Sequence, residues 1–209
     1  MACDYLIMKP TFYTDIFDRY FKEKFWGNKD GSSGPNSAFS ETYLLRENLN
    51  KLLNKLEIES LFDAGCGDAN LIKHLNLPML KQYIGAECSE SLTRQNQENY
   101  KDKDNFEFIN FDLLENPIPS VDLILCRDVV HYWPNEWINL FLENCQRSGS
   151  KYLLITHNTH SPLSANSPTE FGIFRPVNLV QKPFLWPEPI ETIKEDIFAK
   201  ELALFCMGK

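Results

Sequence analysis

The stretch LFDAGCGDAN, Leu61 to Asn70, decides how this chain folds. A short apolar run leads into an acid, and two glycines, Gly65 and Gly67, then bracket a single cysteine. Glycine adopts backbone conformations that are closed to other residues, and it lets a ligand approach the main chain. The pattern therefore predicts either a tight turn or a ligand cradle, and the rest of the sequence has to distinguish the two.

From residue 58 onward, short apolar segments alternate with segments of helical periodicity. We expect strands at residues 60–64, 82–87, 106–112, 121–130 and 150–158, and helices at residues 69–75, 89–100 and 134–148. One crossover lacks a helix, because only residues 113–120 separate the third strand from the fourth. This alternation predicts the α/β class, with a mostly parallel sheet covered on both faces.

The N-terminal part of the chain predicts a helical cap. We expect helices at residues 11–26 and 38–56, joined by the loop 27–37, which is rich in glycine and serine. Glycine-rich hinges permit closure over a site, so residues 1–57 are interpreted as a lid, although a flexible surface connection explains the loop equally well.

The C-terminal part adds a long loop and a hairpin to the same domain. Residues 157–189 show no pattern of their own, which is typical of a functional loop, and we expect them to face the substrate. Residues 190–196 and 201–207 predict a closing antiparallel β-hairpin. We therefore expect one domain over residues 1–209, with residues 58–209 as its core.

The composition favours an intracellular protein that does not bind nucleic acid. The 209 residues carry a formal net charge of −8, whereas a nucleic-acid binder needs a positive surface. The six cysteines are scattered without the spacing of a zinc site, so we expect a reducing, cytoplasmic location and no metal. No segment has the length of a membrane span and no signal peptide is indicated, so no membrane partner is expected.

The spacing around the glycines argues against a phosphate ligand. A dinucleotide cradle requires G-x-G-x-x-G, but Asn70 stands in place of the third glycine. Asp68 would repel a pyrophosphate, and no Gly-Lys-Ser/Thr follows, as a P-loop would require. The dinucleotide and P-loop interpretations are therefore weak.

Three carboxylates at successive strand ends instead favour a cationic nucleoside ligand. Asp63 precedes the glycines and offers a negative charge to an amine. Glu87 ends the second strand, where a carboxylate can accept hydrogen bonds from both ribose hydroxyls. Asp112 ends the third strand, placed to accept from an adenine amine. Each acid alone could simply cap a strand end, but their joint spacing describes S-adenosylmethionine better than any phosphate ligand.

The segment DAGCGDA, Asp63 to Ala69, resembles the D-x-G-C-G-x-G signature of class I S-adenosylmethionine-dependent methyltransferases. The resemblance covers roughly residues 58–157 and the terminal hairpin, which is similar to the reversed last strand of that family. Ala69 replaces the third glycine of the signature, and the long loop replaces the last crossover helix. The resemblance implies a Rossmann-like sheet, an enzyme, and S-adenosylmethionine as its cofactor.

The resemblance also implies a set of cofactor-binding residues at the strand ends. They are Asp63, Gly65, Cys66, Gly67, Glu87, Cys88, Asp112, Leu113, Cys126 and Arg127. Cys66 is expected to pack rather than react, because a thiolate has no task beside a sulfonium. Arg127 is interpreted either as a salt-bridge partner or as an anchor for an acidic acceptor, and the sequence does not separate the two.

Methyl transfer requires in-line alignment and, for a hydroxyl or a protonated amine, a base. His131, just past the fourth strand, is the candidate base because its ordinary pKa lies near neutrality. Asp128 is the second catalytic candidate, either to take the proton or to orient His131. The alternative for His131 is a ring packed under a loop and hydrogen-bonded to backbone.

Aromatic and basic residues on both sides of the site predict an acceptor pocket. The candidates are Phe12, Tyr13 and Tyr20 in the lid, and His157, His160, Phe174, Arg175, Phe184 and Trp186 in or near the long loop. Ordinary packing of the two segments explains these residues equally well.

We expect the acceptor to be a small molecule, such as a saccharide or another metabolite, methylated on oxygen or nitrogen. A nucleic-acid substrate is disfavoured by the charge and by the lack of a D/N-P-P-Y/F tetrapeptide or a Pro-Cys nucleophile. The sequence also leaves open a protein methyltransferase and a non-catalytic module that binds S-adenosylmethionine. It leaves the oligomeric state undecided.

Overall fold

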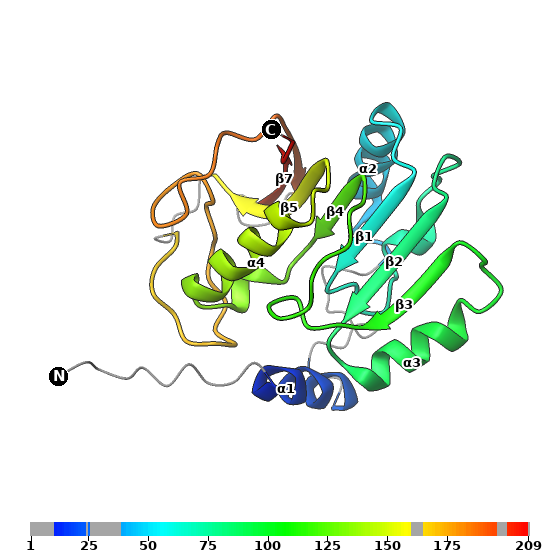
Figure 1. The fold of residues 1–209 in the computed structure, drawn as a ribbon, viewed down its shortest axis with the longest axis horizontal. Helices are drawn as coiled ribbons and strands as arrows, with labels where there is room; N and C mark the ends of the chain where they lie inside the picture. Colours follow the sequence, from blue (N-terminus) through cyan, green and yellow to red (C-terminus); the bar gives the residue numbers. More distant parts are fainter. Residues whose placement is uncertain (1–10, 24, 26–38, 160–164, 196–199, 209) are drawn as a thin grey trace.

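The fold is a three-layer α/β sandwich built on one sheet (Figure 1). The computed structural model describes residues 11–23, 25, 39–159, 165–195 and 200–208. Within them the strand order is β3-β2-β1-β4-β5-β7-β6, with β1 to β5 parallel and the β6–β7 hairpin antiparallel. The predicted α/β class, the mostly parallel sheet and the closing hairpin are confirmed.

The strands and helices have the following bounds. The strands are β1 Ser60–Ala64, β2 Gln82–Glu87, β3 Phe106–Asn110, β4 Leu123–Cys126, β5 Tyr152–Asn158, β6 Glu191–Glu195 and β7 Lys200–Cys206. The α-helices are α1 Thr11–Lys22, α2 Tyr43–Lys55, α3 Glu90–Asn99 and α4 Asn135–Arg147, and two short 3-10 turns are η2 Ile72–His74 and η3 Val130–Tyr132.

Alternate residues of each strand supply two apolar cores, one on each face of the sheet. On β1, Leu61 belongs to one core and Phe62 to the other; on β4, Leu125 and Ile124 divide in the same way. The leucines of α2 cover the first core, whereas α4 and residues 177–184 of the long loop cover the second. Each fully buried side chain of this size contributes about 1.5–3 kcal/mol.

One expected helix is wrong. Residues 69–75 form only the short turn η2, not an α-helix that opens directly after the glycines. Ala69 adopts a positive φ of 55°, and the Asp68 carboxylate accepts a hydrogen bond from the Asn70 N–H, so the chain turns instead of starting a helix. A second positive φ, 59° at Asp128, bends the chain away from the sheet after β4, which explains why that strand is shorter than expected.

Smaller corrections concern the ends of other elements. α1 ends at Lys22 and α2 begins at Tyr43, so both helices are shorter than their apolar patterns predict. β3 ends at Asn110, which leaves Asp112 beyond the strand.

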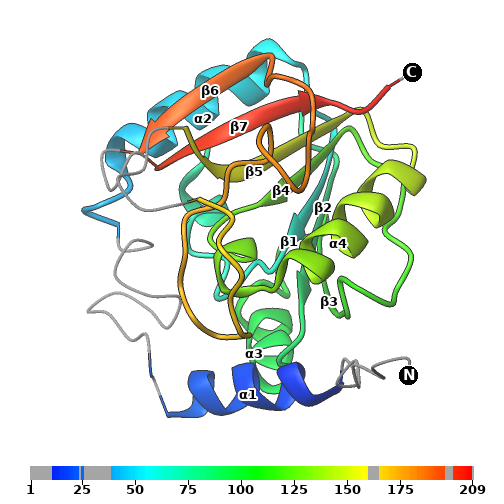
Figure 2. The same cartoon turned by 90° about the vertical axis from the view of Figure 1, so that its left-hand side faces the viewer.

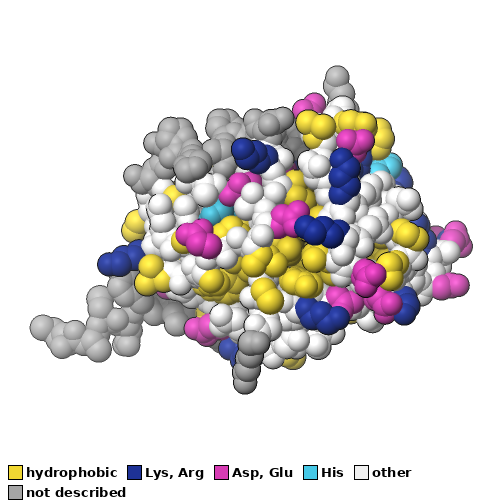
Figure 3. All heavy atoms as spheres, turned by 90° about the horizontal axis from the view of Figure 1, so that it is seen from above, with side chains coloured by type: hydrophobic (Ala, Val, Ile, Leu, Met, Phe, Trp, Pro, Cys, Tyr) yellow, Lys and Arg dark blue, Asp and Glu magenta, His cyan; other side chains and the backbone are white. Residues whose placement is uncertain are grey.

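The first helix lies across the edge of the sheet where the parallel strands end. In Figures 1 and 2, α1 (dark blue) runs below the arrowheads of β1 to β3 and beside α3, which it contacts. The opposite face mixes charged and apolar side chains, and its Lys and Arg residues form no continuous patch in Figure 3. The predicted site residues lie at the carboxyl ends of these strands, the edge of the sheet that α1 covers.

Candidate active site

The glycine turn after β1 is tightly fitted between β2 and the segment after β4. Gly65 and Gly67 have positive φ angles of 75° and 57°. The Gly65 N–H donates to the Ala86 carbonyl at 2.9 Å, and a Cβ on Gly65 would stand 2.5 Å from the Cγ2 of Val129. Both the angle and the contact exclude other residues at Gly65.

Helix α3 holds this turn through two side chains that the sequence analysis missed. Buried Asn96 donates from its Nδ2 to the Gly67 carbonyl at 2.7 Å, and the Tyr100 hydroxyl donates to the Ala69 carbonyl at 3.2 Å. Asn96 lies in α3 and Tyr100, four residues later, is the C-cap of that helix, so the two side chains lie one turn apart on the same side. That spacing was the signal in the sequence, but nothing local showed that this face meets the glycines.

Asp63 is buried beneath the turn. Its Oδ2 accepts a hydrogen bond from the Tyr83 hydroxyl at 2.8 Å, and Tyr83 is another residue that the sequence analysis missed. Burial and, less strongly, the Glu87 carboxylate raise the pKa of Asp63 to about 7, although the hydrogen bond from Tyr83 and the charge of Arg127 oppose this rise.

Glu87 at the end of β2 also points at the glycine turn. Its Oε2 accepts from the Gly67 N–H at 3.1 Å, and its Oε1 accepts from the Ser89 N–H at 3.1 Å. Burial raises the pKa of Glu87 in spite of these hydrogen bonds. Two buried carboxylates, Asp63 and Glu87, thus lie at the turn, and the charge of Glu87 disfavours that of Asp63.

Asp112 occupies a less buried position beyond β3. Its Oδ1 accepts from the backbone N–H groups of Leu114 and Glu115 at 2.8 and 3.2 Å, which forms a local turn. Its charge raises the pKa of the Cys88 thiol, although burial does so more strongly. Asp112 therefore lies beside the end of β2, and buried Leu113 follows it in the apolar core.

The three cysteines among the predicted site residues are neutral thiols. Burial raises the pKa of Cys66, Cys88 and Cys126 well above the ordinary value. The Sγ of Cys66 would lie 3.1 Å from a Cβ on Gly85, which makes it a packing residue of the turn. Cys126 is fully buried in β4.

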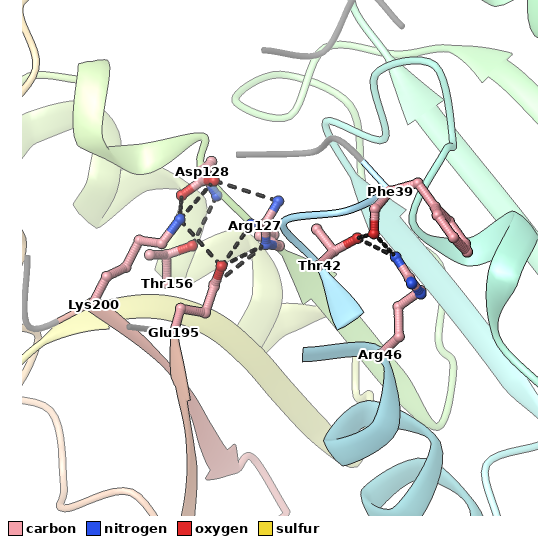
Figure 4. A network of polar contacts seen from close by, with 8 residues as sticks. All are labelled: Phe39, Thr42, Arg46, Arg127, Asp128, Thr156, Glu195 and Lys200. Atoms are coloured by element: carbon pink, nitrogen blue, oxygen red, sulfur yellow. Dashed lines mark hydrogen bonds and ion pairs between the residues drawn. The ribbon is translucent and has the colours of Figure 1, made fainter. Parts of the chain in front are cut away.

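The end of β4 carries a network of four charges (Figure 4), in which three side chains are buried and that of Asp128 is 26% exposed. Arg127 donates to Glu195 at 2.5 Å, and Lys200 contacts both oxygens of Asp128, at 3.0 and 2.9 Å, and Glu195 at 3.2 Å. Burial opposes the charge of Arg127, but Asp128 and Glu195 outweigh it and raise its pKa. Of the two interpretations of Arg127, this geometry favours the salt-bridge partner.

Asp128 is committed to the same network. Burial opposes its ionisation, but Arg127 and Lys200 hold its pKa below the ordinary value. A carboxylate with a lowered pKa is a poor proton acceptor, so this geometry favours an electrostatic role for Asp128 over that of the base. Its backbone N–H donates to the Thr156 hydroxyl at 2.8 Å, which ties the end of β4 to β5.

His131 in η3 is almost fully buried and has one ring nitrogen, Nε2, without a hydrogen-bond partner among the described residues. The His131 ring also forms a hydrogen bond with the buried side chain of Asn158, whose Oδ1 accepts from the Val177 N–H at 3.1 Å. Burial lowers the pKa of His131 to about 4, against the attraction of Asp128. The ring is thus neutral near pH 7, with Nε2 able to accept a proton.

Some of the residues predicted to line the acceptor pocket lie outside the described residues. The side chains of Phe12 and Tyr13, as well as His160, lie outside the described residues. Tyr20 stacks on Phe25 at 4.5 Å between ring centroids. Phe17 of α1 instead meets the long loop, with its ring 5.6 Å from that of Phe171.

A single carboxylate joins α1 to α3. Asp18 accepts hydrogen bonds from the hydroxyls of Ser89 and Ser91, at 2.6 and 2.5 Å, and pairs with Lys22. Burial opposes its ionisation, but these contacts outweigh it and hold its pKa below the ordinary value. The negative charge lies at the start of α3, where the helix dipole favours it.

The loop residues have different surroundings. Phe174 is exposed, and its ring lies 5.2 Å from that of His131. Phe184 is buried in the core and Trp186 packs on Phe205 at 5.3 Å, which fits the packing interpretation of both. His157 is buried and accepts from the Leu179 N–H at 3.2 Å, and its Nε2 has no hydrogen-bond partner among the described residues.

The described part of the chain shows neither a metal cluster nor a membrane span. No group of three or more His, Cys, Asp or Glu side chains there could hold a metal ion. No helix in the same residues is long and apolar enough to cross a membrane.

The comparisons with known proteins agree with this geometry. Residues 61–149 match a family described as a methyltransferase domain. Residues 61–149, less than half of the chain, are thus similar to a methyltransferase domain. The match contains the glycine turn, the three predicted acids and the candidate base, and the predicted class I methyltransferase family is confirmed. No curated protein matches the chain.

Solved structures of methyltransferases share the fold of this domain. Magnesium protoporphyrin IX methyltransferase from Synechocystis PCC 6803, with bound SAH, is 16% identical with a TM-score of 0.56, and the match covers 73% of each chain. Human N-acetylserotonin methyltransferase, in complex with SAM, is 14% identical with a TM-score of 0.59 over 96% of this chain and 56% of that one.

A third solved methyltransferase structure has a similar fold. Phosphoethanolamine N-methyltransferase 1 from Haemonchus contortus is 18% identical with a TM-score of 0.54, over 78% of this chain and 38% of that one. Identities this low show the fold alone. The predictions of a methyltransferase enzyme and of S-adenosylmethionine as its cofactor agree with the family match over residues 61–149.

Proposed function

We propose that this chain transfers a methyl group from S-adenosylmethionine to an oxygen or nitrogen atom of a small molecule. The observation that carries the proposal is the pair of buried carboxylates, Asp63 and Glu87, at a turn where only glycine fits. Burying two like charges together is unfavourable unless a cation or a bound proton compensates them, and a cationic ligand can replace the proton. A cofactor with an amine and a sulfonium meets that need.

The residues present suit the parts of the cofactor in the order that the sequence predicts. Asp63 would attract the cationic end, Glu87 would accept from the ribose hydroxyls, and Asp112 would accept from the adenine amine. Glu87 is already oriented by the Gly67 and Ser89 N–H groups, so little ordering remains for it at binding. When bound, S-adenosylmethionine supplies an activated methyl group.

The chain's own contribution to the chemistry is to position the acceptor and to remove its proton. His131 is the proposed base, because its Nε2 lacks a partner within the described residues and the ring is neutral near pH 7. The expectation that the His131 pKa lies near neutrality is wrong, because burial lowers it to about 4; the ring is unprotonated near pH 7 but is a weak base in the free protein. The in-line arrangement of the reacting atoms would therefore supply most of the acceleration. Asp128, held by Lys200, would stabilise the imidazolium that forms.

A small acceptor is favoured over a macromolecule by charge. The net charge of −8 disfavours nucleic acid. The related structures named above are described as methyltransferases of magnesium protoporphyrin IX, N-acetylserotonin and phosphoethanolamine, all small molecules. The site does not select a saccharide over other metabolites.

Calorimetric titration with S-adenosylmethionine and with NAD tests the cofactor. We expect S-adenosylmethionine alone to bind, and binding of NAD alone would contradict the proposal. Release of S-adenosylhomocysteine is then measured with a panel of hydroxyl- and amine-bearing metabolites and, in parallel, with a tRNA and a histone peptide. Turnover on the macromolecules alone would replace the proposed substrate class, and binding without any turnover would indicate a non-catalytic module.

A further inference from the structure

Three arginines are buried in the described part of this chain, and they differ in how their charge is compensated. Arg127 pairs with two carboxylates, Glu195 and Asp128 (Figure 4). Arg46 donates to the Phe39 carbonyl and the Thr42 hydroxyl, and its guanidinium lies 3.9 Å from the centroid of the Phe39 ring. Charge or an aromatic face thus compensates both of these arginines.

Arg175 in the long loop has no such compensation. Only 5% of the residue is exposed, and its Nη2 donates to two neutral acceptors, the Trp133 carbonyl at 2.9 Å and Asn135 Oδ1 at 2.6 Å. Its Nε and Nη1 are buried and have no hydrogen-bond partner among the described residues. The carboxylate that acts on its pKa is Glu136, which is exposed to solvent and does not reach ion-pair distance.

A buried guanidinium with unpartnered nitrogens is costly. Leaving a buried donor unsatisfied costs about 1–3 kcal/mol, and more when the group is charged. Two hydrogen bonds from Nη2 would suffice to tie the loop to the start of α4, and a neutral side chain could make them. The charge of Arg175 therefore calls for an anionic partner that comes from outside the described residues.

The backbone of Arg175 lies beside the candidate base, and its charge acts on the pKa of His131. The backbone N–H of Arg175 donates to the His131 carbonyl at 3.0 Å, and the preceding residue, Phe174, packs its ring against that of His131. Phe174 and Ile173 are exposed, so solvent begins within one or two residues of the buried guanidinium. A proton acceptor, His131 Nε2, and two unpartnered nitrogen donors thus stand on adjoining segments.

We propose that Arg175 binds an anionic oxygen group, a carboxylate or a phosphate, on the methyl acceptor. The inference rests on the proposed function, because it takes His131 as the base beside the reacting atom. The acceptor would carry its hydroxyl or amine within a short chain of atoms from that anionic group. Charged hydrogen bonds to the guanidinium then hold the nucleophile against His131.

Titration with simple anions tests this assignment. Acetate and inorganic phosphate are added to the protein, with and without S-adenosylhomocysteine, and acetamide is the neutral match for acetate. The readout is the Nε–Hε resonance of Arg175 in NMR spectra, assigned by its disappearance in Arg175→Lys. We expect acetate, phosphate or both to shift this resonance with saturation, and acetamide to leave it in place.

Two variants complete the test through calorimetric anion affinity. Arg175→Gln should weaken anion binding at least tenfold, whereas Arg147→Gln, at an exposed arginine on α4, should not change it. Anion affinity equal to wild type in Arg175→Gln, or an unshifted Arg175 resonance in the wild-type protein, would overturn the inference. The wild-type resonance decides the matter even if Arg175→Gln does not fold.

The cofactor arm separates the two proposals. Binding of S-adenosylhomocysteine without an anion effect at Arg175 would remove the inference and leave the proposed function intact. An anion effect without any binding of S-adenosylhomocysteine would support an anion site and contradict the proposed function.

Discussion

The two halves of the sheet's carboxyl edge, at β1–β3 and at β4–β5, satisfy their polar groups in different ways. On the β1–β3 half, backbone groups do most of the work: the glycine turn hydrogen-bonds to β2, and the N–H groups of Gly67 and Ser89 hold Glu87. On the β4–β5 half, side chains dominate, and His131, His157 and Arg175 keep buried nitrogens that no described residue satisfies, whereas on the β1–β3 half Asn96 keeps one such oxygen.

The difference follows from what each half would bind. A cofactor has one shape, so a turn built from backbone groups and two fixed acids can be complete before it arrives. An acceptor has to present a nucleophile and lose a proton, so its half keeps hydrogen-bonding capacity in reserve. The contrast predicts that substitutions on the two halves affect different measurements.

The largest expected effect is on turnover and comes from the acceptor half. His131→Ala removes the proposed base, and we expect turnover to fall by about 10²–10⁴-fold, because general-base catalysis contributes that much. Affinity for S-adenosylmethionine, measured by calorimetry, should stay within about twofold. Wild-type turnover should hold from neutral pH down to about pH 5 and decline as the pH approaches the His131 pKa of about 4. Unchanged turnover in the variant would remove His131 as the base.

The buried charge network that flanks this half should dominate stability. Glu195→Gln removes the nearer of the two carboxylates that pair with Arg127, and we expect a loss of about 3–5 kcal/mol in the free energy of unfolding, measured with urea. Glu191→Gln on the same strand is the matched control, because Glu191 pairs with Lys55 in an exposed position and should cost less than about 1 kcal/mol. Equal losses in the two variants would show that burial of the network is irrelevant.

On the cofactor half, the glycine turn should control affinity. Gly65→Ala forces a side chain into a positive φ and against Val129, and we expect affinity for S-adenosylmethionine to fall by about tenfold to a hundredfold. Gly172→Ala is the control, since Gly172 has a φ of 88° but nothing within 4 Å of the added Cβ. If both variants bind S-adenosylmethionine with the same affinity, the contact with Val129 does not affect cofactor binding.

The smallest expected effect is a pH dependence of cofactor binding. With a pKa of about 7, raised from 3.8, Asp63 holds a proton in the free protein below neutrality, whereas a cationic cofactor favours its carboxylate. Binding should therefore release a proton below pH 7, and affinity should rise by up to about tenfold per pH unit as the pH approaches 7, then level off. Calorimetry in buffers of different ionisation enthalpy measures this proton.

The same raised pKa acts on stability with the opposite trend. The contribution of Asp63 to folding is fully present below about pH 4 and is lost as the pH rises through about 7. Asp63→Asn should abolish the proton release and flatten both profiles. A pH-dependent affinity that persists in Asp63→Asn would assign the effect to Glu87, whose pKa is raised as well.

How far the sequence could lead also differs between the halves. Strand periodicity and glycine spacing are local signals, and they were enough to predict the sheet and the positions of Asp63 and Glu87. The contacts of Tyr83, Asn96 and Asn158 depend on which segments meet in three dimensions, and no local pattern carries that information. The prediction of a helix after Gly67 was wrong for a related reason: the positive φ of Ala69 suits the turn and opposes helix initiation.

The contact of Asp18 with Ser89 has a kinetic consequence. The Ser89 hydroxyl donates to Asp18 on α1, while its N–H donates to the carboxylate of Glu87. Ser89 thus contacts both α1, which covers the strand ends, and Glu87, the acid proposed to bind the ribose hydroxyls. Departure of α1 removes a partner from the residue that orients Glu87, so exchange of spent cofactor and undocking of this helix should share a rate.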